Sequence, residues 1–243
     1  MIHLFTDFGW GGPYVGEMKT VLARELPGVC LLDLMHDAPN YNPKASAYLL
    51  AALSRRFVAG DICLGVVDPG VGDSNRRAII LDVDGVQFVG PDNGLFAVLA
   101  HRATRVECHE ILWRPAQYSS SFHGRDVFAP VVCVLQKGMP INSRILPVES
   151  LVGTDYPMQL AEIIYIDIFG NAVTGLNADQ YPEQTTLSLH GHRLQKARTF
   201  SGVGQGELFW YTNSLGLIEI AANQASASDA LGLSIGATCL LEN

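Results

Sequence analysis

Four short loops place an ionisable or amide side chain beside glycine at the end of an apolar segment. They comprise residues 6–9 (TDFG), 67–72 (VDPGVG), 122–126 (FHGRD) and 167–171 (DIFGN). Glycine opens backbone conformations that are closed to other residues and lets a ligand approach the chain closely. Turn chemistry alone explains any one of these loops. The four together indicate a site built from carboxylates, an amide and a histidine.

The loop at Asp68 follows a β-branched apolar run, residues 62–67, which is typical of a buried strand. In open α/β sheets, ligands bind outside the carboxyl ends of the strands, so Asp68 stands where chemistry is usually done. Asp7 repeats the pattern after the apolar residues 2–5. A tight turn whose aspartate only caps local amides is the alternative that this stretch leaves open.

The elements that position these loops alternate between strand and helix in the first half of the chain. A hairpin is expected around Asp84-Gly85, which would pair residues 78–83 with 86–89. The alternation predicts an α/β fold with a mainly parallel sheet covered on both faces, and the hairpin makes that sheet mixed. The other strands are expected at residues 2–5, 29–35, 62–67 and 106–112. Helices are expected at residues 13–26 and 43–57, a short one follows residues 90–94 and ends near residue 101, and a last one starts within residues 122–126 and ends at residue 137.

The pattern changes after residue 138. Periodicity lapses and Pro, Ser and Asp appear over residues 139–158, which indicates a linker. Beyond it no long helix is evident, and strand-like segments occur at 162–167, 186–189, 208–211, 217–220 and 237–241. The sequence therefore predicts an α/β domain over 1–138, a linker over 139–158 and a smaller β domain over 159–243, with a site near their junction.

The composition narrows the function classes. The 243 residues are 48% hydrophobic and 16% charged, which is typical of a soluble globular protein with a large interior. A net charge of −8 without a Lys/Arg run argues against nucleic acid or an acidic membrane as partner. The five cysteines are odd in number and form no CxxC pair, so we expect reduced thiols in a cytoplasmic protein. Neither a signal peptide nor a membrane span is expected.

Taken with further motifs, the loops resemble the S-adenosyl-L-methionine hydroxide adenosyltransferases. These hydrolases form adenosine and are relatives of the S-adenosylmethionine-dependent fluorinase and chlorinase. The resemblance covers nearly the whole chain in order. Besides the four loops, it is carried by residues 76–78 (RRA), 90–94 (GPDNG), 128–130 (FAP), Asn213-Ser214, Gly216 and Glu219.

The resemblance implies a catalytic triad of aspartate, arginine and histidine. Position by position, the triad falls on Asp68, an arginine just after its loop, and His123. One residue more than the family pattern stands in residues 73–75, so aligning Arg-Arg-Ala selects Arg76 and leaves Arg77 as the alternative. The segment at residues 35–40 (MHDAPN) also departs from the family pattern.

The resemblance also implies a set of ligand contacts. Asp7 matches the residue that holds the ribose hydroxyls, and Asp167 and Asn171 match contacts to the methionine end and the nucleoside. It implies trimers, in which each site lies between one subunit's N-terminal domain and its neighbour's C-terminal domain. No cofactor is implied, because S-adenosyl-L-methionine is the substrate. Further pocket positions are Ser214, Glu219 and the backbone near Ala222.

The implied reaction is in-line attack of water or hydroxide on ribose C5′, with methionine leaving as a neutral thioether. A guanidinium and an imidazole beside one water favour its hydroxide form, and a carboxylate orients both the guanidinium and the water. His123 is the natural proton acceptor. Acceptance of the proton and simple orientation of the water both remain open at this point.

Two other functions remain as alternatives. One is halide-dependent nucleoside formation, although halogenating relatives lack the aspartate that this chain keeps at Asp68. The other is a module that binds S-adenosylmethionine or adenosine without turnover. Two groups of residues have the spacing of metal ligands, His190 with His192 and Asp33 with His36 and Asp37. A metal is not expected, because histidines two positions apart on a strand merely share a face and no third ligand is evident.

Structural roles explain several other residues. Arg125 and Asp126 are expected to pair locally at the start of a helix. Trp10 and Trp210 are each either core residues or aromatic walls for adenine, and the sequence does not decide between these roles.

Overall fold

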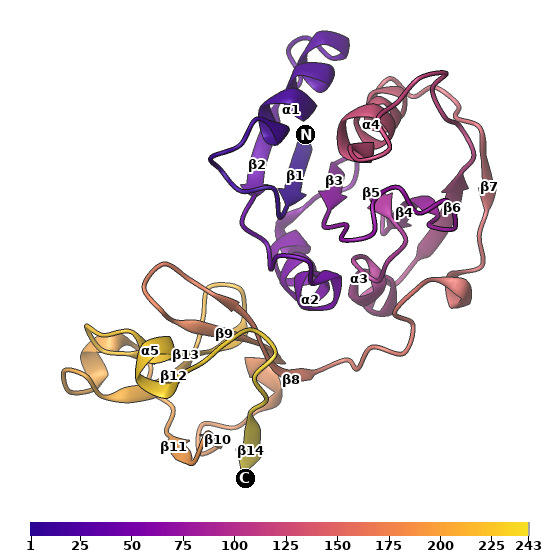
Figure 1. Ribbon diagram of the computed structural model, residues 1–243. Coiled ribbons are helices and arrows are strands. Elements are labelled where there is room, and N and C mark those ends of the chain that lie inside the picture. The colour runs from indigo at the N-terminus through magenta and orange to yellow at the C-terminus, as the bar shows by residue number, and fades with distance from the viewer. Residues whose placement is uncertain (243) are drawn as a thin grey trace. The chain divides into compact units, whose positions relative to one another are not determined.

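The computed structural model describes residues 1–242 and divides the chain into two compact units. The first unit is Met1–Tyr156, and the second begins at Pro157 (Figure 1). The segment 139–158, expected as a linker, contains strand β7 (Ser143–Ile145) and the short helix η3 (Val148–Ser150), and both lie in the first unit.

The first unit is built on a seven-stranded sheet with the order β2-β1-β3-β5-β4-β6-β7. Neighbouring strands are parallel from β2 to β5 and antiparallel from β5 to β7, which confirms the predicted α/β class with a mixed sheet. Its strands besides β7 are β1 (Ile2–Thr6), β2 (Leu31–Met35), β3 (Ile62–Val66), β4 (Ala78–Val83), β5 (Val86–Pro91) and β6 (Val106–Ile111).

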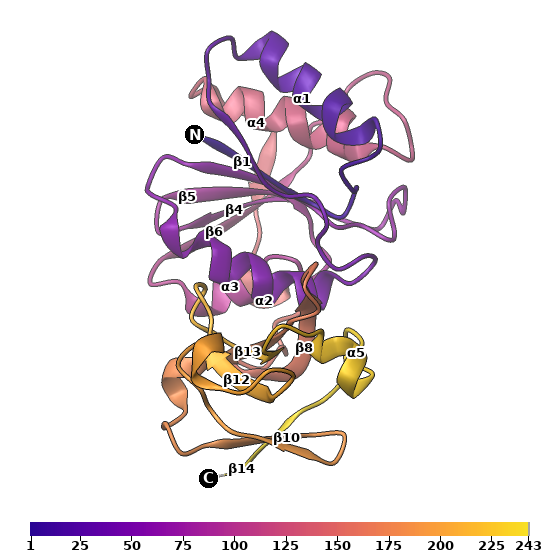
Figure 2. The same ribbon diagram turned by 90° about the vertical axis from the view of Figure 1, so that its left-hand side faces the viewer.

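Helices cover both faces of this sheet. Helices α1 (Tyr14–Glu25) and α4 (Ala129–Gln136) lie on one face, and α2 (Pro43–Leu53) and α3 (Ala97–Arg102) on the other (Figure 2). Because the sheet is covered on both sides, β1 and β3 are buried at all five positions, as their continuous apolar runs predict. Two short helical turns complete the unit, η1 (Ser54–Arg56) and η2 (Gly124–Phe128).

Local sequence signals explain where several elements begin and end. Helix α2 starts with Pro43 in its first turn, and the Asn42 side chain accepts a hydrogen bond from the amide of Ala45 at 3.0 Å. Asp84 and Gly85 have φ values of 52° and 89°, as a two-residue hairpin turn between antiparallel strands requires. The helix α2 ends at Leu53, earlier than residue 57, because a 3₁₀ turn follows it.

The second unit consists of two antiparallel sheets. One has the order β12-β13-β9-β8, and the other has the order β11-β10-β14. Strands β9 and β11 and the short helix α5 (Ala227–Leu231) were not expected from the sequence. The strands are β8 (Leu160–Ile166), β9 (Ala172–Asn177), β10 (Thr186–Leu189), β11 (His192–Leu194), β12 (Leu208–Thr212), β13 (Leu217–Ala222) and β14 (Leu240–Glu242), with short turns η4 (Ala178–Gln180) and η5 (Phe200–Gly202).

The two tryptophans left open by the sequence have different environments. Trp210 is fully buried in the core of the second unit, and its Nε1 donates to the carbonyl oxygen of Thr185 at 3.1 Å. Trp10 is 64% exposed. Trp210 is therefore a core residue. Among residues 1–242, no helix has the length and apolarity needed to cross a bilayer.

Candidate active site

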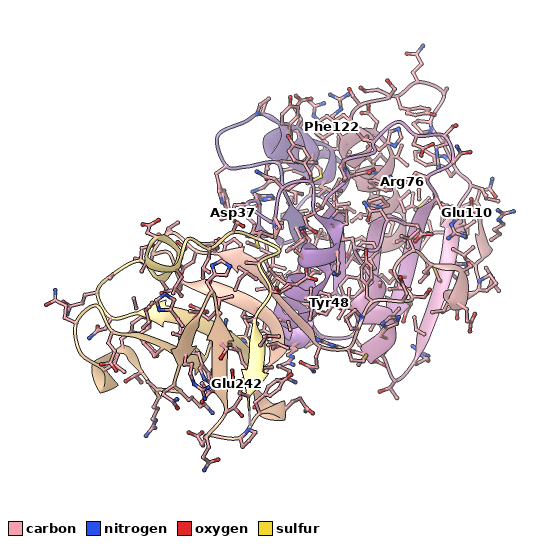
Figure 3. The ribbon with its side chains drawn as sticks, turned by 60° about the horizontal axis from the view of Figure 1, so that its bottom comes forward. Asp37, Tyr48, Arg76, Glu110, Phe122 and Glu242 are labelled. Carbon is pink, nitrogen blue, oxygen red and sulfur yellow. The ribbon has the colours of Figure 1, made fainter. Side chains whose placement is uncertain are left out.

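The carboxyl ends of β1 and β3 bring two of the expected carboxylates together. The strands are adjacent and parallel, and Thr6 pairs with Val66 in their register. Asp7 and Asp68 therefore leave the sheet at the same edge. Both line one cavity of about 550 Å³, together with His123 from the loop before η2. Figure 3 shows Arg76 and Phe122 in the first unit, on loops after β3 and before η2.

Asp68 forms an ion pair with Arg76. Nη1 of Arg76 donates to Oδ1 of Asp68 at 2.6 Å, and the amide of Gly70 donates to the same oxygen at 3.2 Å. The Asp68 side chain is only 4% exposed. Burial raises the pKa of Asp68 above its usual value, while the charge of Arg76 and the Gly70 amide act in the opposite direction. The guanidinium of Arg76 is thus fixed against Asp68, which lines the cavity.

Arg77 has a different set of partners. Its Nε donates to Oδ2 of Asp92 at 2.7 Å, and its other nitrogens donate to the hydroxyl and the carbonyl oxygen of Ser150. Asp92 is buried and also accepts from the amide of Val152 at 3.0 Å. Arg77 therefore ties the loop after β5 to the end of the first unit, and it is Arg76 that faces Asp68.

Gly70 is required by the close approach of Arg76. A Cβ built on Gly70 would lie 2.3 Å from Nη2 and 2.9 Å from Cζ of Arg76. Gly70→Ala is expected to displace the guanidinium and to lower kcat at least about tenfold, because a misplaced donor loses most of its value in the transition state. Steady-state kinetics measure this, with Gly16→Ala as control because a Cβ there meets nothing within 4 Å. Equal kinetics in both variants would contradict the assignment.

His123 lies in the turn that leads into η2, a π-helical segment. Such segments are frequent at functional sites. Burial lowers the pKa of His123 below its usual value, and the charge of Asp68 acts in the opposite direction. The Tyr118 ring lies 5.6 Å from the imidazole, centroid to centroid. His123 therefore favours its neutral form near neutral pH.

The turn around His123 is fixed by its neighbours. Asp126 accepts from the amide of Ser119 at 2.8 Å and from Nε of Arg125 at 2.6 Å. Arg125 also pairs with Glu17 of helix α1. The expected local pair of Arg125 and Asp126 is thus present, and it extends to a helix more than one hundred residues away in the sequence.

Asp7 and an aromatic wall form the other side of the cavity. Oδ2 of Asp7 accepts from the amide of Tyr41 at 3.2 Å. Burial raises the pKa of Asp7, the Tyr41 amide lowers it, and the charge of Asp68 raises it further. The rings of Phe8, Tyr14 and Phe122 meet edge to face, with centroid separations from 5.4 to 6.1 Å. The cavity thus combines carboxylates with apolar ring surfaces.

The second unit holds a separate cavity of about 630 Å³, lined by Asp167, Asn171 and Ala222. Asp167 accepts from the amides of Phe169 and Asn171, each at 2.9 Å, and from Nδ2 of Asn171 at 3.0 Å. The carboxylate therefore shapes the loop that carries it. The remaining lining residues are Phe169, Phe200, Tyr211, Gln224 and Ala225.

Two of the expected contacts do not line this cavity. Glu219 is buried and accepts from the Tyr211 hydroxyl at 2.6 Å and from Nδ2 of Asn213 at 2.7 Å. It therefore holds Tyr211, which lines the cavity. Burial raises the pKa of Glu219, against the effect of both hydrogen bonds. Ser214 is exposed in the turn between β12 and β13.

Family models match both parts of the chain. The SAM hydroxide adenosyltransferase N-terminal domain matches residues 2–144, and the C-terminal domain of the same family matches residues 161–240. The chain belongs to this family. Among similar members, an (R)-S-adenosyl-L-methionine hydrolase of Thermus thermophilus is 35% identical, over 97% of this chain and 96% of the relative.

Other proteins are similar to this chain over nearly its whole length. An (R)-S-adenosyl-L-methionine hydrolase of Salinispora tropica is 34% identical over 97% of this chain and 95% of its own, and a fluorinase of an Actinoplanes species is 23% identical over 98% and 96%. The crystal structure of an uncharacterized conserved protein from Thermotoga maritima covers 100% of both chains with a TM-score of 0.89 and 30% identity.

The histidines and carboxylates with metal-like spacing have other partners in the structure. No group of three or more His, Cys, Asp and Glu side chains among residues 1–242 is arranged to hold a metal ion. His190 lies in the turn between β10 and β11, and its Nδ1 bonds to the carbonyl oxygen of Leu231 at 2.9 Å. Asp33 and His36 bond to each other.

Sequence reasoning missed most of the cavity walls. Tyr14 and Tyr41 line the first cavity, and Phe200 and Tyr211 line the second. Phe8, Phe122 and Phe169 stand inside the glycine loops, so their motif position was a usable signal. The others carry no such signal, because isolated aromatic residues are more often part of a core.

Proposed function

We propose that this chain hydrolyses S-adenosyl-L-methionine to adenosine and L-methionine. The observation that carries the proposal is the cavity lined by Asp68, His123 and Asp7, in which Asp68 is bonded to Arg76 at 2.6 Å. The chain also belongs to a family with relatives that are named (R)-S-adenosyl-L-methionine hydrolases, which supports the same reaction.

The reaction is an in-line displacement at ribose C5′. An oxygen of water forms the bond to C5′ while the C5′–S bond breaks, and the electron pair stays on sulfur, so methionine leaves as a neutral thioether. The sulfonium is a good leaving group, and the scarce component is the nucleophile, because free water has a pKa of about 15.7. The protein therefore has to lower the cost of removing a proton from one water.

Asp68, Arg76 and His123 are the residues that we assign to this task. Arg76 stabilises the negative charge that develops on the water oxygen, and Asp68 holds the guanidinium in place. The neutral imidazole of His123 accepts the proton, since its pKa is lowered by burial. Holding water and C5′ in line adds to the acceleration, because effective molarities reach about 10⁵–10⁸ M.

The remaining assigned residues bind substrate. Asp7 accepts hydrogen bonds from the ribose hydroxyls, Asp167 serves the methionine end and Asn171 the nucleoside. Ser214, Glu219 and the backbone at Ala222 complete the assigned contacts, with Glu219 acting through Tyr211. No cofactor or metal takes part in the proposed reaction. We propose that the enzyme works in the cytoplasm, and its five cysteines without disulfides support this, because thiols stay reduced there.

Following adenosine and methionine by chromatography tests the activity. Purified enzyme with S-adenosyl-L-methionine is expected to form both in equal amounts, with or without EDTA. Excess fluoride, chloride or bromide is expected to leave adenosine as the product, because Asp68 is present. A 5′-halonucleoside as main product means that the nucleophile is halide. Tight binding without turnover over hours means that the chain is a sensor.

The subunit arrangement is the second part of the proposal. We propose a homotrimer in which each site takes its first unit from one subunit and its second unit from a neighbour. His123→Ala changes only the first unit, and Asn171→Ala only the second. When the two impaired variants are mixed and reassembled, about a quarter of the sites should lack both changes, and activity at low substrate concentration should rise above that of either variant alone. No recovery in a mixture shown by mass to exchange subunits would contradict this arrangement.

A further inference from the structure

A chain of side-chain hydrogen bonds runs beneath the loop that carries Asp7. Nζ of Lys19 donates to Oδ2 of Asp33 at 2.8 Å, and Oδ1 of Asp33 lies 3.1 Å from Nε2 of His36. Nδ1 of His36 lies 2.8 Å from Oγ1 of Thr6, the residue before Asp7. His36 and Thr6 are both fully buried. Figure 3 labels the neighbouring residue Asp37 in the first unit.

The chemistry of the partners gives the chain a direction. Burial favours protonation of Asp33, but the hydrogen bonds from Lys19 and His36 outweigh it and lower the pKa of Asp33, so this carboxylate only accepts. Nε2 of His36 therefore carries the hydrogen. Nδ1 of His36 is then the ring atom that bonds to the Thr6 hydroxyl, whose oxygen also accepts from the amide of Phe8 at 3.3 Å.

His36 meets the loop at two further points. Its carbonyl oxygen accepts from the amide of Gly9 at 2.6 Å, and its ring lies 4.9 Å from the ring of Trp10, edge to face. The contacts to Thr6 on one side and to Gly9 and Trp10 on the other flank Asp7 in the sequence. The Asp7 carboxylate itself is held by the amide of Tyr41 at 3.2 Å.

We propose that His36 is a positioning residue for Asp7. The buried imidazole, oriented by the Lys19–Asp33 pair, locks the Thr6 hydroxyl and with it the backbone on either side of Asp7. This inference rests on the proposed function in one respect, the role of Asp7 as a ribose contact. A ligand contact must be held to within about 0.5 Å to keep its value, and such a supporting bond sets that precision.

Strand β1, which ends at Thr6, holds a second buried histidine that serves as a matched comparison. His3, in β1, is also buried, and its Nε2 also lies 3.1 Å from an aspartate oxygen, that of Asp61. Nδ1 of His3 has no hydrogen-bond partner, whereas Nδ1 of His36 bonds to Thr6. His36→Gln and His3→Gln thus each remove a buried imidazole paired with aspartate, but only the first breaks the connection to the loop of Asp7.

The Kd of adenosine, measured by calorimetry, and the KM for S-adenosyl-L-methionine test the inference. His36→Gln is expected to raise both by about tenfold, the effect of losing one buried hydrogen bond, while kcat changes by less than about threefold. Thr6→Val, which keeps the shape of the side chain, is expected to do the same, and Thr6→Ser to restore wild-type values. His3→Gln is expected to lower thermal stability and leave both constants unchanged.

A double-mutant cycle then asks whether His36 acts through Asp7. In an Asp7→Ala background, His36→Gln is expected to weaken adenosine binding by less than about twofold more. Full additivity overturns the inference, as does an equal effect of His36→Gln and His3→Gln, or an unchanged KM in Thr6→Val. If the wild type binds adenosine but hydrolyses no S-adenosyl-L-methionine, the proposed function fails alone, and the cycle still decides the inference. If it binds no adenosine, both fail.

Discussion

Replacing Arg76 with alanine is expected to lower kcat and kcat/KM together by about 10²-fold or more, while the same change at Arg77 leaves kcat nearly unchanged. Arg76 is the guanidinium bonded to Asp68, at 2.6 Å. An interaction made mainly in the transition state appears in both constants when it is removed. Arg77 is bonded to Asp92 and Ser150.

The Arg77 variant is expected to lose stability but to keep its turnover. Asp92 is buried, and without Arg77 it keeps the amide of Val152 as a donor but loses its counter-charge. Breaking a buried pair by removing one partner costs about 3–5 kcal/mol, so Arg77→Ala should unfold at a clearly lower temperature. Thermal unfolding of both variants, beside kinetics at a temperature where both are folded, gives the comparison.

The two variants control for each other, because both remove an arginine from adjacent positions. The expected result is a contrast in turnover, in which Arg76→Ala is slow and Arg77→Ala is near normal. Both variants are expected to unfold at a lower temperature, because each leaves a buried aspartate without its counter-charge. A severe kinetic defect in Arg77→Ala beside a near-normal Arg76→Ala would transfer the role to Arg77. Normal turnover in both would remove arginine from the mechanism.

Much of the first unit was predictable because its signals are local. The strands β1 and β3 are continuous apolar runs, and the turn at Asp84-Gly85 needs positive φ at both residues, which this pair tolerates. Strand β9 was missed because its interior glycine weakens the pattern. A Cβ on Gly175 would lie 2.6 Å from Cβ of Leu160, so the glycine is explained only by the neighbouring strand β8.

Part of the candidate site is likewise predictable from local sequence, and part depends on packing between distant residues. The meeting of Asp7 and Asp68 follows from the ends of adjacent parallel strands, which a sequence pattern predicts. The choice between Arg76 and Arg77 depends on which guanidinium turns toward Asp68, and the geometry of one loop decides that. The bond from Tyr41 to Asp7 joins residues 34 positions apart in the chain. Contacts of that kind arise from packing and leave no local trace.

The pH dependence of kcat/KM is expected to show an acid limb that belongs to His123. Burial lowers the pKa of this imidazole below its ordinary value of about 6.5, and the opposing charge of Asp68 is the smaller effect. The neutral ring accepts the proton from water, so activity is present above the lowered pKa and is lost as pH falls through it. The midpoint is therefore expected below about pH 6.5.

His123→Gln separates this titration from that of Asp68. The variant is expected to lose about 10²-fold or more in kcat and to lose the limb, because glutamine does not titrate. A limb that belongs to Asp68 remains, where its carboxylate takes up a proton and releases Arg76, and burial moves the pKa of this carboxyl upward. His109→Gln removes an imidazole paired with Glu107 on β6 and should leave the profile unchanged. A His123→Gln enzyme whose acid limb keeps the wild-type midpoint would assign the titration to Asp68 and leave His123 to orient the water.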